Sequence, residues 1–221
     1  MSKKIVIFGA GNIGELAYYY FTHDTNYQVA GFCIDNEYVK ADSFCNLPVC
    51  PLEDILEKFP PEKFKVFIAL SYKKINEIRK NKYLLLERMG YEFASYVSSK
   101  AVILNNNLIG KNAFILENNV IQPFSSIGDN VTLWSGNHIG HHSKIGSHTF
   151  ISSHTVISGG VEIGEQCFIG VNATLRDHIT IGNRVVIGAG VLMLNSADEN
   201  GVYRAESTHR SKVSSARIGN I

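Results

Sequence analysis

Histidine is concentrated in one stretch of the chain. Of the eight histidines in 221 residues, six lie between positions 138 and 178, namely His138, His141, His142, His148, His154 and His178. Imidazole changes its charge near neutral pH, so it can act as a general base or as a metal ligand. Whether these histidines are bases, metal ligands or ordinary surface residues depends on the structural elements that carry them.

A second chemical signal lies near the N-terminus. An apolar run is followed by Gly9-Ala10-Gly11-Asn12-Ile13-Gly14, and the next apolar run ends in Asp35-Asn36. Glycines after a strand permit a tight turn into a helix, whose N-terminal N–H groups favour a phosphate, while an acid after the second strand binds a ribose hydroxyl. Gly11, Asn12, Ile13, Asp35 and Asn36 are therefore candidate nucleotide-binding residues.

The pattern leaves two alternatives to a mononucleotide. By itself it is typical of NAD sites, but only about 95 residues precede the repeat described below, which is one half of a dinucleotide-binding fold. The glycines would otherwise serve only to pack a helix onto a sheet. We expect a nucleotide of some kind at this loop.

The first hundred residues predict an α/β domain. Short apolar runs at 5–8, 29–34, 66–70 and 93–97 alternate with helical patterns at 12–23, 52–59 and 74–89. Strands that alternate with helices form a parallel sheet with helices on its faces. We predict a Rossmann-like domain over residues 1–98.

The rest of the chain follows a period of six. From Ile109 to Met193 every sixth residue is aliphatic, and eight of these fifteen positions are followed directly by Gly. The fourth residue after each aliphatic is mostly small, as at Ala113, Ser125, Ser143, Thr149, Thr155, Cys167 and Ala173. A period of six fits neither a helix nor an alternating strand, but it is the signature of a parallel β-helix.

Three six-residue sides would close one triangular coil. The aliphatic side chain would point inward, the small residue would fill the tapered interior, and Gly or Asn would permit the corner. We predict this domain over residues 99–200, followed by a tail over 201–221. His148, His154 and His178 share one position of the repeat, and we expect them to be solvated corner residues.

A metal site is one function that this repeat could carry. His142 and His178 are 36 residues apart, so they would share an edge two coils apart. The γ-class carbonic anhydrases use such a scaffold and bind zinc with three histidines, the third close in sequence to one of the others. Asn183 stands where that third ligand would be, so the ligand set is incomplete and we expect no metal.

Composition argues against several partners. With 21 basic and 20 acidic residues the formal net charge is +1, which gives no footprint for nucleic acid or an anionic membrane. The N-terminal apolar stretch is interrupted by glycines, so it predicts neither a signal peptide nor a membrane span. Cys33, Cys45, Cys50 and Cys167 show no C-x-x-C spacing, so we expect free thiols in a cytoplasmic protein.

Together these motifs resemble the PglD and NeuD-like sugar acyltransferases, in which a Rossmann-like nucleotide-sugar domain precedes a left-handed β-helix. The resemblance covers roughly residues 3–200. It rests on four segments: Phe8–Gly14, Gly31–Asn36, Ser135–His142 and Ile157–Gly164.

The resemblance implies a homotrimer with acetyl-CoA in the cleft between adjacent β-helices and a nucleotide-linked amino sugar on the N-terminal domain. It implies that His141 is the general base. His142 stands where relatives usually have a carboxylate, and we count it as a second catalytic candidate. The backbone N–H of Gly159 would bind the oxyanion, and Val171 and Ala189 would contact the pantetheine arm of acetyl-CoA.

We therefore expect acetyl transfer from acetyl-CoA to the amino group of a nucleotide-linked amino sugar, by direct attack and without a metal. The same-class alternative is O-acetylation of a sugar hydroxyl, as on sialic acid or a polysaccharide precursor, which would need a stronger base. A non-catalytic nucleotide-binding scaffold and an NAD-linked enzyme are the alternatives from other classes.

Overall fold

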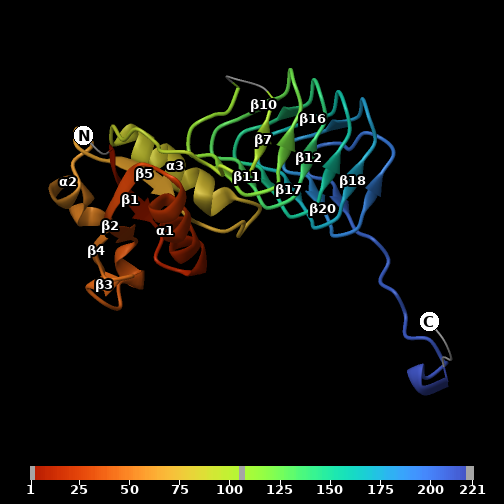
Figure 1. Cartoon of the computed structure of the whole chain (residues 1–221), viewed down its shortest axis with the longest axis horizontal. Coiled ribbons are helices and arrows are strands. Elements are labelled where there is room, and N and C mark those ends of the chain that lie inside the picture. The colour runs from red at the N-terminus through yellow and green to blue at the C-terminus, as the bar shows by residue number, and fades with distance from the viewer. Residues whose placement is uncertain (1–2, 105–107, 218–221) are drawn as a thin grey trace.

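The computed structural model describes residues 3–104 and 108–217. An α/β domain adjoins the first coils of a three-sided β-helix, and the C-terminal segment leads away from both (Figure 1). The predicted limits at residues 1 and 221 lie outside the described residues. No helix in the described part of the chain is both long and apolar enough to span a membrane.

The α/β domain is built on a mostly parallel sheet in which β1 lies between β2 and β5. Its order is β3-β4-β2-β1-β5. The strands are β1 (Lys3–Phe8), β2 (Tyr27–Ile34), β3 (Ser43–Phe44), β4 (Leu47–Pro51) and β5 (Lys65–Ile68), and only β3 runs antiparallel to its neighbour. The helices are α1 (Asn12–Asp24), α2 (Ile55–Lys58) and α3 (Glu77–Arg88), with 3-10 turns at Asn36–Tyr38 and Leu52–Asp54.

Alternation along β1 explains why helices cover both faces. Ile5 and Ile7 pack in one core cluster with Phe21 of α1. Val6 and Phe8 pack in the other with Tyr83 and Leu86 of α3, which these clusters place on the opposite face of the sheet. A strand buried on both faces reads as a continuous apolar run, as this one does.

The sequence prediction missed three details here. The strand β4 was not predicted, because Pro48 and Pro51 argue against a strand. Proline is tolerated near the edge of a sheet, and β4 is next to β3, which is the edge strand. The helix predicted over 74–89 begins only at Glu77, because residues 74–76 all have positive φ. In the run 93–97, Phe93 bridges to β5, but Tyr96–Val97 is the first strand of the β-helix.

The β-helix consists of three parallel sheets, which we name by their number of described strands. The four-stranded sheet contains β10 (Ser126–Ile127), β13 (Lys144–Ile145), β16 (Glu162–Ile163) and β19 (Thr180–Ile181). The six-stranded sheet contains β7 (Val102–Ile103), β9 (Val120–Ile121), β12 (His138–Ile139), β15 (Val156–Ile157), β18 (Thr174–Leu175) and β21 (Leu192–Met193). The seven-stranded sheet contains β6 (Tyr96–Val97), β8 (Phe114–Ile115), β11 (Thr132–Leu133), β14 (Phe150–Ile151), β17 (Phe168–Ile169), β20 (Val186–Ile187) and β22 (Val202–Tyr203).

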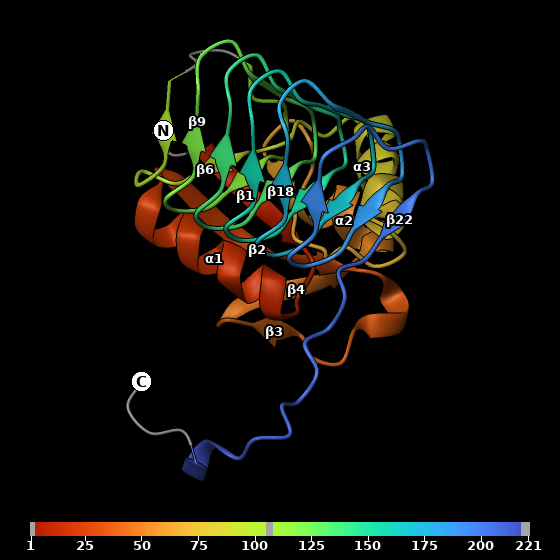
Figure 2. The same cartoon turned by 90° about the vertical axis from the view of Figure 1, so that its right-hand side faces the viewer.

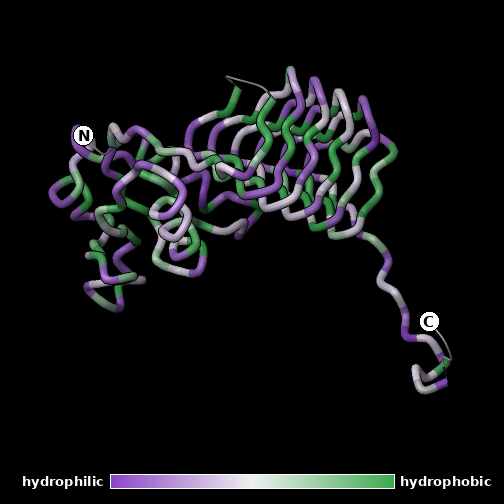
Figure 3. The backbone as a smooth tube through the Cα atoms, in the orientation of Figure 1, coloured by the Kyte–Doolittle hydropathy of each residue, from purple (hydrophilic) through white to green (hydrophobic). Residues whose placement is uncertain are grey.

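The register confirms the six-residue period. Thr132 pairs with Phe114 on one side and Phe150 on the other, so one coil takes 18 residues. Every aliphatic of the series from Ile115 to Met193 is buried in one continuous core, and Ile109 is half-buried against it. Figure 3 shows hydrophobic and hydrophilic segments recurring coil after coil.

The role that we expected for the glycines after the aliphatics is wrong. The positive-φ corner lies two residues further on and recurs every six residues from Asn112 to Gly190, where Asn, His, Gln, Arg and Phe occupy it besides Gly. The glycines have another cause, because a Cβ on Gly146 would lie 2.4 Å from the backbone of the next coil. They permit coils to approach closely.

The α/β domain packs on the seven-stranded sheet. Tyr72 contacts the rings of Phe150 and Phe168, and Arg79 of α3 bonds to Thr132. Near the first coils, Tyr20 of α1 donates a hydrogen bond to Glu117. Viewed along the coils, α1 lies below the β-helix and α3 lies to its right (Figure 2).

Candidate active site

The three corners of the β-helix differ in what covers them. The histidine corner, between the six-stranded and four-stranded sheets, carries His141 and His142. The α3 corner, between the four-stranded and seven-stranded sheets, carries His148. The third corner, between the seven-stranded and six-stranded sheets, carries His154.

The backbone holds His141 firmly at its exposed corner. Its N–H donates to the Oε1 atom of Gln122 at 2.9 Å, one coil earlier. Its carbonyl accepts the N–H of Gly160 at 2.8 Å, one coil later. Sequence analysis missed Gln122, because nothing in its spacing marks it as a side chain that caps the next coil.

The two imidazole rings meet through one pair of atoms. Nδ1 of His141 lies 3.1 Å from Nδ1 of His142, with the ring planes at 85°. His142 in turn packs on the ring of Phe124, 4.8 Å between centroids. The structure thus brings together both predicted catalytic histidines.

Gly159 lies directly beside the His141 ring. A Cβ at this position would be 2.6 Å from Cε1 and 2.8 Å from Nε2 of His141, so only glycine lets the ring rest on the backbone here. Among the hydrogen bonds of the described residues, none uses the N–H of Gly159 as donor. The base candidate and the predicted oxyanion donor are neighbours.

The other acetyl-CoA candidates lie elsewhere. Val171 and Ala189 are exposed at the third corner, across the six-stranded sheet from His141. One chain therefore holds these predicted acetyl-CoA contacts on two edges of the same sheet.

The glycine loop divides into packing and open positions. A Cβ on Gly9 would lie 2.6 Å from the Ala69 carbonyl oxygen, and one on Gly14 only 2.0 Å from that of Gly9. A Cβ on Gly11 would meet nothing within 4 Å, although Gly11 has an ordinary extended φ of −117°. Packing explains two of the glycines, and the third leaves space at the N-terminus of α1, next to Asn12 and Ile13.

Asp35 has a partner that sequence analysis did not find. Lys82 of α3 forms an ion pair with one carboxylate oxygen of Asp35, and its ammonium lies 5.4 Å from the centre of the Phe8 ring. Both side chains are largely buried, and Asn36 begins the 3-10 turn that follows. A lysine on an amphipathic helix carries no signal of such a role, since most are solvated.

The nucleotide loop and the histidine corner are separated within one chain. In a three-sided coil, the corner between the six-stranded and four-stranded sheets lies opposite the seven-stranded sheet. The α/β domain covers that seven-stranded sheet. A site that uses both His141 and Gly11 therefore needs two chains.

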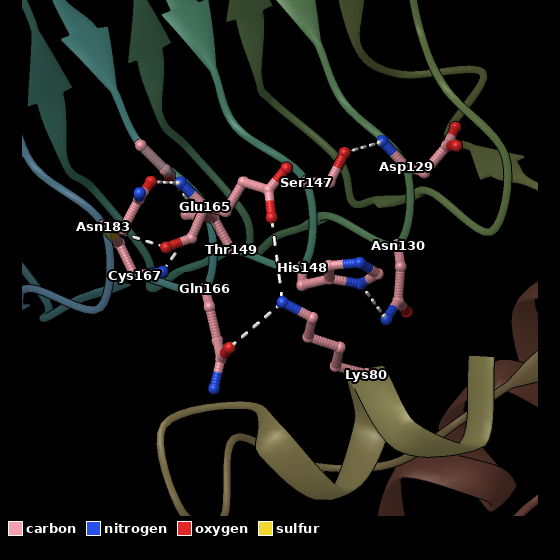
Figure 4. Close-up of polar contacts among 11 residues, drawn as sticks. Lys80, Asp129, Asn130, Ser147, His148, Thr149, Glu165, Gln166, Cys167 and Asn183 are labelled. Carbon is pink, nitrogen blue, oxygen red and sulfur yellow. Dashed lines mark hydrogen bonds and ion pairs between the residues drawn. The ribbon is translucent and has the colours of Figure 1, made fainter. Parts of the chain in front are cut away.

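The α3 corner contradicts one expectation. We expected His148 to be solvated, but it is only 6% exposed because α3 covers it. Its Nδ1 atom forms a hydrogen bond with Nδ2 of Asn130 (Figure 4). Asn130 in turn accepts a hydrogen bond from Asn112, so the three side chains form a buried column. Burial, with Lys80 and Arg79 nearby, lowers the pKa of His148 from 6.5 to about 4. His154 and His178 are exposed, as predicted.

Two cationic side chains of α3, Lys80 and Arg79, bind the α3 corner of the β-helix. Lys80 reaches Glu165 at 3.7 Å and Gln166 at 3.4 Å (Figure 4). Arg79 is completely buried and bonds to neutral oxygens of Thr132, Asn76 and the backbone at 148–149. Burial lowers the pKa of Arg79 to about 9. These contacts fix the α/β domain on the β-helix.

The described residues offer no cluster of metal ligands, and their cysteines are free thiols. No group of three or more His, Cys, Asp or Glu side chains within 3–104 and 108–217 is arranged to hold a metal ion. Cys33 and Cys50 pair across β2 and β4 and are both buried and unbridged. A hydrogen bond with Cys50, together with burial, raises the pKa of Cys33.

Comparison with known proteins gives one family match. The family profile of the bacterial transferase hexapeptide (six repeats) matches residues 124–159 and 160–195. No curated protein sequence matches the chain with significance.

Several solved structures are similar over nearly the whole chain. PerB from Caulobacter crescentus, in complex with CoA and GDP-perosamine, has a TM-score of 0.80 and 20% identity over 91% of this chain and 94% of its own. The acetyltransferase domain of PglB from Neisseria gonorrhoeae, with acetyl coenzyme A, has a TM-score of 0.76 and 22% identity over 91% and 96%. WeeI from Acinetobacter baumannii has a TM-score of 0.77 and 20% identity over 90% and 96%.

At these identities the similarity establishes the fold. Residues 124–195 carry bacterial transferase hexapeptide repeats, and the chain as a whole has the two-domain architecture of these structures.

Proposed function

We propose that this protein is a PglD/NeuD-like sugar N-acetyltransferase, which moves the acetyl group of acetyl-CoA to the amino group of a nucleotide-linked amino sugar. The observation that carries the proposal is the exposed ring of His141 resting against the Cα side of Gly159, which has no side chain there. The shared fold with PerB, which was solved with CoA and GDP-perosamine, supports the choice of substrates.

The chemistry is a direct transfer. The neutral amine attacks the thioester carbonyl, a C–N bond forms, and the Nε2 atom of His141 takes the proton that the nitrogen loses. The N–H of Gly159 stabilises the oxyanion. When the C–S bond breaks, the proton passes from His141 to the sulfur and releases CoA as a thiol.

The nucleotide occupies the α/β domain in this proposal. Its diphosphate lies at Gly11, where the first N–H groups of α1, from Asn12 and Ile13 onward, point at an anion. Asp35 and Asn36 contact the ribose or base. The ion pair with Lys82 uses one carboxylate oxygen of Asp35 and leaves the other for the ligand.

A homotrimer completes the site. Four of the six outward positions of the six-stranded sheet are apolar, and among them Val102 is 50%, Val156 40% and Leu192 60% exposed. Such a patch is typical of a face that another chain covers. A second copy packed on this sheet brings its histidine corner close to Val171 and Ala189 of the first copy, where the pantetheine arm lies. The cytoplasmic location stays a prediction.

The nucleotide site is tested by Gly11→Asp. The backbone is extended, a Cβ has free space, and α1 lacks a side-chain cap, so aspartate should cap the helix and preserve stability. Its charge should lower affinity for a UDP-, GDP- or dTDP-amino sugar by about 100-fold, since like charges in contact cost several kcal/mol. Calorimetry should find CoA binding unchanged.

Gly11→Ser is the matched control, because serine caps the helix without a charge. It should keep most of the nucleotide affinity. If the Asp and Ser variants bind the nucleotide sugar as tightly as the unmodified protein, the loop is no nucleotide site.

A second experiment distinguishes N- from O-acetylation. Release of the CoA thiol should occur with a nucleotide-linked amino sugar and not with the counterpart that carries a hydroxyl in place of the amine.

A further inference from the structure

Four residues stack at the left-handed position of the histidine corner in successive coils: Phe124, His142, Gly160 and His178. Asn, His and Gly are common at positive φ, but a bulky aromatic there is a genuine outlier. Phe124 has a φ of 65° and is 69% exposed, so neither backbone preference nor burial explains it. Its contact is the ring of His142.

The contact between the histidines limits their protonation states. Nδ1 of His141 and Nδ1 of His142 are 3.1 Å apart. A neutral imidazole carries one proton, on either Nδ1 or Nε2, and a hydrogen bond needs one donor and one acceptor. In the neutral pair, one histidine therefore has its proton on Nδ1 and the other on Nε2.

Only one of these two arrangements gives a base at the right place. If His142 donated, His141 would carry its own proton on Nε2, beside Gly159, and could not accept another there. If His141 donates, its Nε2 atom has a free lone pair on the side of the ring next to Gly159. The second arrangement matches the chemistry proposed above.

We propose that His142 is a positioning residue: its Nδ1 accepts the Nδ1–H of His141 and holds His141 in the tautomer whose Nε2 is unprotonated. Phe124 supports the His142 ring in that orientation. The choice of His141 as the donor and its catalytic consequence rest on the proposed function, whereas the hydrogen bond between the two Nδ1 atoms does not.

A neutral acceptor differs from the carboxylate that the family resemblance implies at this position. When His141 gains a proton on Nε2, its Nδ1–H still donates to His142, so the imidazolium keeps its partner. No fixed negative charge stabilises it, however, and a second proton on His142 removes the acceptor. Besides each other, the two rings lie next to Phe124 and Gly159, which carry no charge.

Nitrogen-15 NMR of the labelled full-length protein tests the assignment directly. At a pH where both rings are neutral, we expect His141 to carry its proton on Nδ1 and His142 on Nε2. His142→Gly removes the acceptor without backbone strain, because Gly160 occupies the same corner at positive φ. In this variant His141 should change to the tautomer mixture of an unconstrained imidazole.

Two spectra would overturn the proposal. One is an Nδ1–H on His142 in the unmodified protein, and the other is an unchanged His141 tautomer in His142→Gly. His154→Gly is the matched control, since His154 has the same repeat position in the same coil and is exposed. It should leave the His141 signals unchanged.

Kinetics with acetyl-CoA and the best amino-sugar nucleotide of the UDP, GDP and dTDP panel test the consequence. His142→Gly should lower kcat by about 10- to 100-fold, less than the about 10⁴-fold that follows loss of a carboxylate partner in a catalytic triad. KM for acetyl-CoA should hardly change. His142→Asn, whose amide oxygen can accept the same hydrogen bond, should recover part of kcat.

An unchanged kcat in His142→Gly overturns the positioning role. If the spectra show the expected tautomers but no nucleotide sugar of the panel is acetylated, the proposed function fails and the tautomer assignment stands.

Discussion

His142 and His148 occupy the same position of consecutive six-residue repeats, yet one side chain is exposed and the other is buried. Their φ angles are 58° and 64°, so the backbone treats them alike. His142 is exposed beside the candidate base, whereas His148 is buried beneath α3 and its pKa is lowered to about 4. His154, at the third corner of the same coil, is exposed with a φ of 58°.

The difference shows that the repeat fixes the backbone, and the neighbours decide the chemistry. A covered histidine must stay neutral and serves stability, because its Nδ1 atom ends the buried column from Asn112 and Asn130. A bare histidine keeps its capacity to exchange protons with a ligand. Substitutions at the three corners should therefore act on different quantities.

The largest effect should come from the bare corner. His141→Ala should lower turnover by about 10²- to 10⁴-fold, the range for loss of a general base, with little change in stability or in the affinities for both ligands. The deficit should shrink as pH rises towards the pKa of the amine, because a free amine needs less help. Steady-state kinetics across pH, with calorimetry, measure this.

Near wild-type turnover of His141→Ala at neutral pH would remove this residue from the mechanism. His142 or His138 would then be the next base to test.

The covered corner should control the pH dependence of stability. The pKa of His148 is about 4 in the folded protein and 6.5 ordinarily, so above pH 6.5 the residue is neutral in both states and contributes no dependence. As pH falls from 6.5 towards 4, only the unfolded state binds the proton. The free energy of unfolding should therefore fall by up to about 3 kcal/mol.

His148→Asn isolates this effect, because Asn occupies the same repeat position at residue 130 with positive φ. Urea unfolding at several pH values should give a smaller loss of stability below pH 6.5 for this variant than for the unmodified protein. Parallel curves for the two would mean that His148 is protonated in the folded state and that the corner is open.

The third corner should show the smallest effect. His154→Asn keeps the left-handed backbone and removes an exposed ring, so stability should change by less than about 0.5 kcal/mol. Turnover should stay at the wild-type value. Thermal unfolding and one rate measurement suffice, and a large loss of either would show that position in the repeat, rather than covering, sets the role of a histidine.

The fold of the repeat could be predicted because its signal is local and redundant. A single aliphatic at every sixth position specifies coil length, register and core together, and all three agree with the structure. The α/β domain was predicted less well. Strand β4 contains two prolines, and the left-handed residues before α3 carry no Gly to mark them.

In the candidate site, too, contacts set by the repeat could be predicted from the sequence, whereas tertiary contacts could not. The pairing of His141 with Gly159 follows from their spacing of one coil, so sequence could indicate it. The hydrogen bonds of Arg79 and the burial of His148 depend on how α3 docks on the β-helix, and the ion pair of Lys82 with Asp35 depends on how α3 packs on the sheet. These are tertiary contacts between segments far apart in the sequence. No local pattern encodes such docking.

Subunit mixing tests the central claim that His141 and the Gly11 loop of different chains form one site. His141→Ala and Gly11→Asp chains would be co-expressed with different tags, and the mixed oligomers purified through both. Activity would be measured at a nucleotide-sugar concentration well below saturation, where each parent variant alone should be nearly inactive. In a cyclic trimer one site in three should pair an intact His141 with an intact loop, giving about one third of wild-type turnover. Mixed oligomers as inactive as their parents would contradict the account.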